Sequence, residues 1–191
     1  MTKKAIDVLD ERLRNHICTL QKSSFDSTNK ESMCESKLLV VNFDKIPNEY
    51  SRGKGWHGVP KSNDALYVNE QGVWYFIEFK NGTIEKDEIF RKLYDSLIML
   101  IDWGVIPNFS FVRDNINYIL VYNSNKYGKI PESPAREETY SYIMGLASQE
   151  ERLFGIDKLE GYLFNQVHTY TKNLFEREFI IPMEKEEGIE N

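Results

Sequence analysis

The residues best suited to chemistry in this chain are two acids and a lysine, Asp64, Glu78 and Lys80. Carboxylate oxygens are the ligands that Mg²⁺ prefers, and Mg²⁺ keeps several waters that a reaction can use. A lysine beside such a metal can stabilise the charge that develops on a reacting phosphate. These side chains can form a site only if the elements between them bring them together.

A predicted β-hairpin over residues 63–80 would do so. Two apolar runs in this stretch are joined by Asn69–Gly72, where glycine can adopt a positive φ. The second run, 73–79, is apolar at nearly every position, which is typical of a strand buried on both faces. Side chains alternate along a strand, so Glu78 and Lys80 should point to the same side. Charged groups ending such a strand would cost several kcal/mol each without partners, and Asp64 at the start of the neighbouring strand could supply one.

Asp64 followed by Glu78-Phe79-Lys80 resembles the signature of the PD-(D/E)xK nuclease superfamily, which has the restriction-endonuclease-like fold. The resemblance implies that Asp64 and Glu78 hold one or two Mg²⁺ (or Mn²⁺) ions, with the backbone carbonyl of Phe79 as a further ligand. It also implies that Lys80 positions the attacking water and stabilises charge on the phosphate. The proline that precedes the aspartate in the family is absent here, because Asn63 stands at that position.

The same residues have a simpler interpretation. Glu-x-Lys is common on exposed strands, where the two side chains form cross-strand ion pairs. Two features favour the catalytic interpretation in this chain. The motif ends an apolar run rather than an alternating one, and Asp64 precedes it by one hairpin length.

The N-terminal residues 3–21 are predicted to form an amphipathic helix. The apolar stripe consists of Ile6, Leu9, Leu13, Ile17 and Leu20. Some members of the superfamily supply an extra acid from their first helix, and the resemblance makes Asp10, at the edge of this stripe, the candidate. The alternative is a solvated charge. Residues 22–36 are polar and without periodicity, which indicates a loop.

The connection over residues 44–62 is rich in turn formers and precedes Asp64 directly. It contains Gly53–Gly58, a formal match to G-x-G-x-x-G, but the match neither follows a strand directly nor opens a helix, so a dinucleotide site is rejected. The basic residues of this loop surround Trp56, and Lys54 and His57 are candidate accessory residues. The loop could contact a phosphate backbone or stack a base, or it could be a surface loop with Trp56 packed on the core.

The remaining elements complete an αβββαβ order. Residues 37–43 and 117–123 are short apolar runs of strand length, and residues 85–103 have helical apolar spacing with Thr83 as a plausible N-cap. The connection over 104–116 is long enough for a crossover to a parallel strand. The sequence thus predicts an α/β fold with a mixed central sheet flanked by helices, as the resemblance implies. This restriction-endonuclease-like core covers about residues 3–123, and the whole chain, 1–191, is expected to form one domain.

Residues 124–181 are predicted to form a C-terminal α+β extension. It comprises a weak helix over 137–152, an extended segment over 161–169 and a short helix over 172–179 capped by Thr171. His168 lacks a second ligand at metal spacing and is expected to be a packed or edge histidine. The tail, 182–191, is expected to be a solvated acidic end. The extension could serve as a specificity element, a homodimer surface or a cap over the site.

Composition limits the partners. The 191 residues have a net charge of −6, which is the wrong sign for a general nucleic-acid binder unless positive charge concentrates at the site. Two cysteines are too few for a disulfide framework or a zinc site, which suggests a reducing cytoplasm. We expect no membrane partner, since no apolar run reaches the length of a span.

Three functions follow from these observations. The favoured one is a Mg²⁺-dependent nuclease that hydrolyses phosphodiester bonds of DNA or RNA through Asp64, Glu78 and Lys80. A second is an inert relative that keeps the scaffold and binds a protein through its aromatic surface. A third is a metal-dependent hydrolase of a small phosphate ester, which would need little basic surface.

Overall fold

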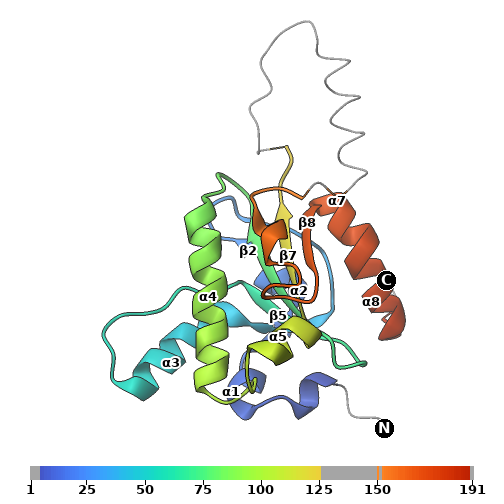
Figure 1. Ribbon diagram of the computed structural model, residues 1–191. Helices are drawn as coiled ribbons and strands as arrows, with labels where there is room; N and C mark the ends of the chain where they lie inside the picture. The colour runs from blue at the N-terminus through green and yellow to red at the C-terminus, as the bar shows by residue number, and fades with distance from the viewer. Residues whose placement is uncertain (1–4, 126–149, 151, 190–191) are drawn as a thin grey trace, which may run out of the picture.

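The computed structural model, which describes residues 5–125, 150 and 152–189, is built around a six-stranded mixed sheet (Figure 1). Its spatial order is β1-β4-β5-β6-β7-β8. The first four of these strands pair antiparallel, whereas β6, β7 and β8 run parallel. The strands span Ile17–Thr19 (β1), Leu39–Asn42 (β4), Ala65–Val68 (β5), Trp74–Lys80 (β6), Ile116–Tyr122 (β7) and Val167–Thr171 (β8). The predicted mixed α/β sheet is confirmed.

The hairpin that carries the acids has the predicted register. Strands β5 and β6 pair from Ala65 opposite Ile77 to Val68 opposite Trp74. Gly72 in the connecting turn has a φ of 80°, which a residue with a Cβ adopts only with strain. Strand β6 is central, with β5 on one side and β7 on the other, so the apolar run of its sequence is explained by burial on both faces.

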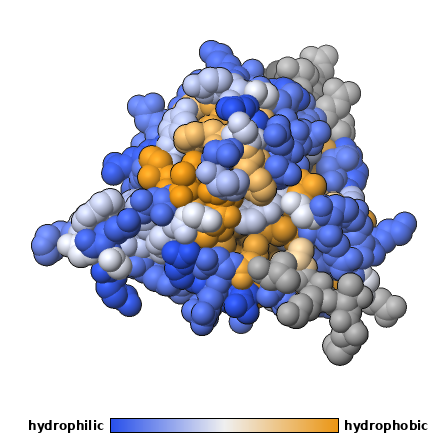
Figure 2. Space-filling view, turned by 60° about the horizontal axis from the view of Figure 1, so that its bottom comes forward, coloured by the Kyte–Doolittle hydropathy of each residue, from blue (hydrophilic) through white to orange (hydrophobic). Residues whose placement is uncertain are grey.

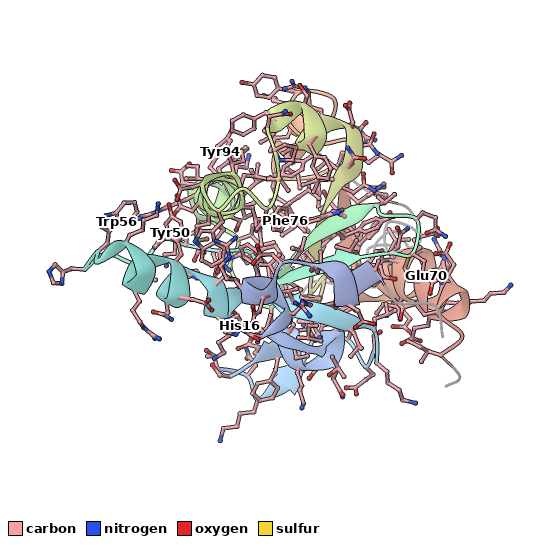
Figure 3. All side chains as sticks on the ribbon, turned by 90° about the horizontal axis from the view of Figure 1, so that it is seen from below. His16, Tyr50, Trp56, Glu70, Phe76 and Tyr94 are labelled. Atoms are coloured by element: carbon pink, nitrogen blue, oxygen red, sulfur yellow. The ribbon has the colours of Figure 1, made fainter. Side chains whose placement is uncertain are left out.

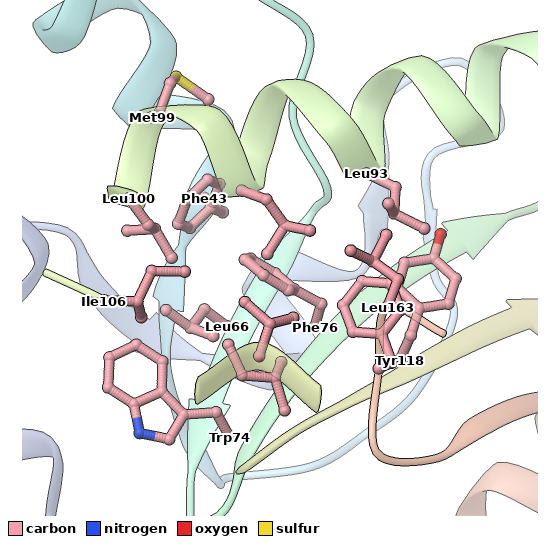
Figure 4. Close-up of a cluster of buried hydrophobic side chains, with 14 of the residues drawn as sticks. Phe43, Leu66, Trp74, Phe76, Leu93, Met99, Leu100, Ile106, Tyr118 and Leu163 are labelled. Carbon is pink, nitrogen blue, oxygen red and sulfur yellow. The ribbon is translucent and has the colours of Figure 1, made fainter. Parts of the chain in front are cut away.

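Helix α4, Lys86–Asp102, covers one face of the sheet (Figure 1). Its buried residues Leu93 and Leu100 pack with Phe76 of β6 and Tyr118 of β7 in the larger of two hydrophobic clusters (Figure 4). The predicted helix is confirmed, but its N-cap is Glu85 rather than Thr83. The acids Asp87 and Glu88 lie in the first turn, where the helix dipole favours negative charge.

The C-terminal helices cover the opposite face (Figure 1). They are α7 (Lys172–Phe175), a π-helical turn η4 (Glu176–Ile180) and α8 (Ile181–Glu186), and Thr171 caps α7 as predicted. Phe175 and Phe179 pack against the residues of β4–β7 that face away from α4. The tail is therefore not the solvated end predicted from its acids. Glu184 is buried and accepts hydrogen bonds from Ser36 Oγ (2.7 Å) and the Lys37 amide (3.1 Å).

The predicted helix over residues 3–21 is wrong. The segment divides into η1 (Ala5–Val8), α1 (Glu11–Arg14), strand β1 and α2 (Leu20–Ser23). Asp10 starts a new helix, since its side chain accepts a hydrogen bond from the Arg12 amide. Ile17–Thr19 then pair with β4, and this tertiary pairing outweighs the helical spacing of the apolar residues.

The two predicted loops contain structure of their own. Residues 22–36 include a short hairpin of β2 (Phe25–Asp26) and β3 (Glu31–Ser32). Residues 44–62 include part of η2 (Phe43–Lys45) and helix α3 (Ile46–Lys54). Pro47 near the start of α3 and Gly55 after its end, with a φ of 68°, are the ordinary boundary residues of a helix.

The segments flanking β7 are only partly as predicted. The crossover from β6 to β7 includes helix α5, Phe109–Asn115, which the sequence pattern did not predict. Strand β8 begins at Val167, after η3 (Ile156–Leu159) and turns, rather than at residue 161. The helix predicted over 137–152 falls almost wholly outside the described residues.

Candidate functional site

Asp64 lies immediately before β5 and is held by its main chain from three sides. Its amide donates to the Ile77 carbonyl (3.2 Å), and its carbonyl accepts from the Phe43 amide (3.0 Å) and Ser23 Oγ (2.8 Å). These bonds fix the direction of the side chain, whose Oδ2 accepts from the Phe79 amide at 2.6 Å. The acid is thereby attached to the strand that carries Glu78 and Lys80.

Lys92 of α4 joins the two acids. Its Nζ donates to Asp64 Oδ1 at 3.1 Å and to Glu78 Oε1 at 2.7 Å. The helix is placed for this contact by Ser96, whose Oγ accepts from the Asn63 amide at 3.0 Å. Asp64 and Glu78 therefore converge at one edge of the sheet, as their positions in the hairpin predicted.

Lys80 belongs to the same cluster. Its Nζ lies 3.3 Å from Glu78 Oε1 and 2.8 Å from Glu88 Oε2 at the start of α4. The Lys80 side chain is 12% exposed and that of Glu88 is 36% exposed. The cluster thus runs from the buried Glu78 outward to a group in contact with solvent.

Asp44, in η2, is a third acid at this edge. Burial and then the charge of Asp64 raise the pKa of Asp44 to about 6, while Lys92 partly offsets them. The site residues predicted from the sequence included neither Asp44 nor Lys92. A signal existed for Lys92, which lies beside Ile89 and Ser96 at three- and four-residue spacing on the buried side of the helix.

Glu78 is the most strongly perturbed acid of the site. Its side chain is fully buried, and burial followed by the charge of Asp64 raises its pKa to about 8, against the opposing effect of Lys92 and Lys80. Burial lowers the pKa of Lys92, but Asp64 and Glu78 together raise it by more, so Lys92 remains charged. Glu78 Oε2 has no hydrogen-bond partner among the described residues.

The Tyr118 hydroxyl is a second buried polar group without a partner among the described residues. It points toward α4 (Figure 4), the side of the sheet on which Glu78 lies. Burial, then the charges of Glu78 and Asp64, raise the pKa of Tyr118 well above its usual value. Tyr118 is therefore a neutral O–H group beside the acids.

The structure does not bring the accessory candidates to this cluster. Asp10 pairs with Arg12 (2.6 Å), whose guanidinium lies over Trp103 after the C-terminal end of α4. Lys54 pairs with Asp102, also at that end of the helix, at 2.5 Å. His57 is an exposed residue of the loop that follows α3.

Trp56 combines features of both interpretations offered for its loop. It is 56% exposed, yet its ring packs edge-on against Tyr50 at 5.6 Å between centroids (Figure 3).

His168 is a packed histidine on an edge strand, as predicted. It stacks on Tyr170 and its Nδ1 lies 3.0 Å from Glu150 Oε2.

The donor types at the site suit Mg²⁺, although the described residues include no group of three His, Cys, Asp or Glu side chains arranged to hold a metal ion. Asp64, Glu78 and the Phe79 carbonyl offer hard oxygen ligands, and Glu78 Oε2 is uncommitted. The ammonium of Lys92 now bridges the two carboxylates. A metal ion held by both acids would therefore require Lys92 to withdraw from at least one of them.

No family model, curated protein or solved structure matches this chain. Within the described part of the chain, no helix has the length and apolar character needed to cross a membrane.

Proposed function

We propose that this protein is a Mg²⁺-dependent phosphodiesterase that cleaves nucleic acid and has a restriction-endonuclease-like core. The observation that carries the proposal is the convergence of Asp64, Glu78 and Lys80, with Lys92, at one edge of the sheet. The order β4, β5, β6, α4, β7 agrees with the last five elements of the αβββαβ core. The first helix of that core is replaced by shorter elements, and strands β1 and β8 extend the sheet at its two edges.

The charge balance of the cluster supports a divalent cation. Four acids, Asp44, Asp64, Glu78 and Glu88, meet two ammonium groups, so the fully ionised cluster is negative. Burial raises the pKa values of Asp44 and Glu78 most, and the negative charge of Asp64 raises them further. A divalent cation would offset this negative charge.

Each residue then has a chemical task. Asp64, Glu78 and the Phe79 carbonyl would hold Mg²⁺, which supplies Lewis-acid activation of the phosphate and of a bound water. Lys80, beside Glu78 and close to solvent, orients the attacking water and stabilises negative charge on the phosphate. Lys92, once released from a carboxylate, offers a second cation to the same phosphate.

A cleavage assay tests this function. End-labelled single- and double-stranded DNA and RNA are incubated with Mg²⁺ or Mn²⁺ and wild type, Glu78→Gln, Lys80→Met or the control Lys86→Met, which alters an exposed lysine of α4. We expect cleavage by wild type and the control, and a loss of at least about 100-fold in the two site variants. Equal activity in wild type and Glu78→Gln, or none in wild type on any substrate, would contradict the proposal.

The alternative is an inert scaffold that binds protein, and two observations favour it. Lys92 already pairs with both acids, as in a purely structural ion-pair network. The surface also carries large exposed apolar residues, including Tyr94 and Ile98 one turn apart on α4. Figure 2 shows hydrophobic residues gathered in the middle of one face and bordered by hydrophilic ones. Absence of cleavage together with absence of metal binding would select this alternative.

A further inference from the structure

A pocket of about 220 Å³ opens beside Asp64, and Lys92, which pairs with this acid, is not among its lining residues. Asp44 and Asp64 form the wall that it shares with the charged cluster, and Phe79 and Asn81 come from the end of β6 and the turn after it. The β2–β3 hairpin supplies Phe25 and Asp26, and Met33 follows that hairpin. The pocket therefore adjoins the place where the proposed function puts the scissile phosphate.

The lining does not suit a phosphate group. None of the described residues that line the pocket is a lysine or arginine, and three of them are acids. Most of its lining residues are polar: besides the three acids they include three serines and Asn81, and only Phe25, Phe79 and Met33 are apolar. Carboxylates, hydroxyls and an amide can hydrogen-bond the polar edge of a planar heterocycle, and an aromatic ring beside them can stack on its face.

Phe25 is the exposed aromatic residue of this lining. Its side chain is 54% exposed, whereas Met33 is 3% exposed. The exposed part of the ring, at the lining of the pocket, is available to stack on a ligand. The ring can stack on a base without reading its sequence, because every base has a π-face.

The hairpin that holds Phe25 is fixed to the catalytic strand. Asn81 follows Lys80 directly, and its Nδ2 donates to Asp26 Oδ2 (2.9 Å) and to Glu31 Oε1 (2.8 Å), one acid from each strand of the hairpin. Asn81 Oδ1 in turn accepts from Asn123 Nδ2 at 2.7 Å, next to the end of β7. Phe25 is thus held in a set position relative to the acids, as a substrate-positioning group should be.

We infer that this pocket receives one unpaired nucleobase next to the scissile phosphate, with Phe25 as the stacking surface. The inference rests on the proposed function and adds a substrate class to it, namely single-stranded or locally unpaired nucleic acid. A base in a regular duplex is stacked and paired, so it could enter a pocket of this kind only after leaving the helix. In this arrangement the phosphate contacts Lys80 and Lys92, and the base enters the pocket beside Asp64.

The test compares two ligands of equal charge in metal-free buffer. Fluorescence anisotropy measures binding of a labelled single strand of about 12 nucleotides and of an abasic strand with the same number of phosphates. Because the phosphates are matched, the ratio of the two Kd values reports base contacts alone. The proteins are wild type, Phe25→Ala, Phe25→Trp, which keeps an aromatic surface, and Phe109→Ala. Phe109, 46% exposed on α5, is the matched control.

We expect wild type to favour the base-bearing strand by roughly tenfold. Phe25→Ala should lose most of this preference, while Phe25→Trp and Phe109→Ala keep it. A wild type without preference, or a preference unchanged in Phe25→Ala, would overturn the inference. Neither result would contradict the proposed function, which the metal-dependent cleavage assay tests separately.

Discussion

At the scale of single residues, Lys92 decides how the site is held together. Its ammonium neutralises part of the charge of Asp64 and Glu78, and its side chain is only 14% exposed. Removing one partner of a buried ion pair is costly, because the remaining charges lose their compensation. The same contacts place a cation where a metal ion held by both acids would otherwise lie.

Substitution of Lys92 should therefore leave Asp64 and Glu78 free to bind a metal ion. We expect Lys92→Met to lower the free energy of unfolding by about 3 kcal/mol in metal-free buffer. Millimolar Mn²⁺ should restore much of that loss, since a cation that binds only the folded state stabilises it. Urea denaturation with and without Mn²⁺ measures both effects, with the exposed Lys86→Met as control. A loss that Mn²⁺ leaves unchanged would favour a purely structural network.

Substitution of Glu78, unlike that of Lys92, should leave the stability unchanged or raise it, while it abolishes activity. Its buried carboxyl has one oxygen without a partner among the described residues, so ionisation there opposes folding. Glu78→Gln keeps the shape and removes the charge. We expect an unchanged or higher melting temperature, with up to about 2 kcal/mol of added stability, together with loss of activity. A variant that melts much earlier than wild type would mean that the carboxylate is required for the fold.

The residue-level predictions succeeded where one element determined the geometry. Alternation along β6 and the hairpin register fix Glu78, Lys80 and Asp64 relative to one another, and both can be read from local sequence. Lys92 and Asp44 were missed because their contacts depend on how α4 and η2 pack on the sheet. Asp10 was misplaced because the helix that was to carry it does not form.

At the scale of elements, the β2–β3 hairpin depends on the ionised form of Asp26. Hydrogen bonds from Asn29 and then from Asn81 lower the pKa of Asp26 to about 2, below the value of about 3.9 expected in the unfolded chain. A lowered pKa means that the carboxylate contributes stability above about pH 4. That contribution is lost as the pH falls toward 2.

Asp26→Asn should accordingly be less stable than wild type near neutral pH, and the difference should shrink as the pH falls from 4 toward 2. The expected difference at pH 7 is below about 1 kcal/mol, because the group is partly solvated. Urea titrations at pH 7, 4 and 3 measure it. Asp114→Asn, an exposed site on α5, is the control. A difference that grows in acid would mean that the Asp26 carboxylate opposes folding instead of supporting it.

The C-terminal helix gives a second prediction at this scale. Glu184 is buried and accepts from Ser36 Oγ and the Lys37 amide, so Glu184→Ala would leave donors without their acceptor. We expect a loss of about 2 kcal/mol in unfolding free energy. Glu186→Ala, at an exposed position of the same helix, should change it little. Equal stability of the two variants would show that the docking of α8 does not depend on Glu184.

The elements that could be predicted from the sequence are those with one clear period and ordinary boundaries. Helix α4 and strands β4, β6 and β7 belong to this group. Helix α3 and the β2–β3 hairpin are short and rich in turn formers, so their local pattern resembles a loop. The acids of residues 182–191 suggested a solvated tail. The burial of Glu184 could not be predicted, because its partners, Ser36 and Lys37, lie far away in sequence.

At the scale of the whole molecule, the fold brings acidic and basic side chains from distant parts of the sequence together at one site. The chain has a net charge of −6, yet Lys80 and Lys92 meet at the edge of the sheet where Asp64 and Glu78 converge. Because four acids lie beside these two lysines, the fully ionised site is itself negative, and a bound divalent cation would have to supply the local positive charge that a phosphate needs. A weak overall attraction to nucleic acid is compatible with a substrate held mainly by the metal, the two lysines and a stacked base.

The most direct measurement is a calorimetric titration of Mn²⁺ into wild type and into Glu78→Gln at pH 7.5. The proposed function predicts binding to wild type and a loss of at least tenfold in affinity in the variant, since Glu78 supplies a ligand. Lys86→Met should bind as wild type does. Equal Mn²⁺ affinity in wild type and Glu78→Gln would contradict a metal centre at Glu78, and no binding to wild type would contradict a site assembled without substrate.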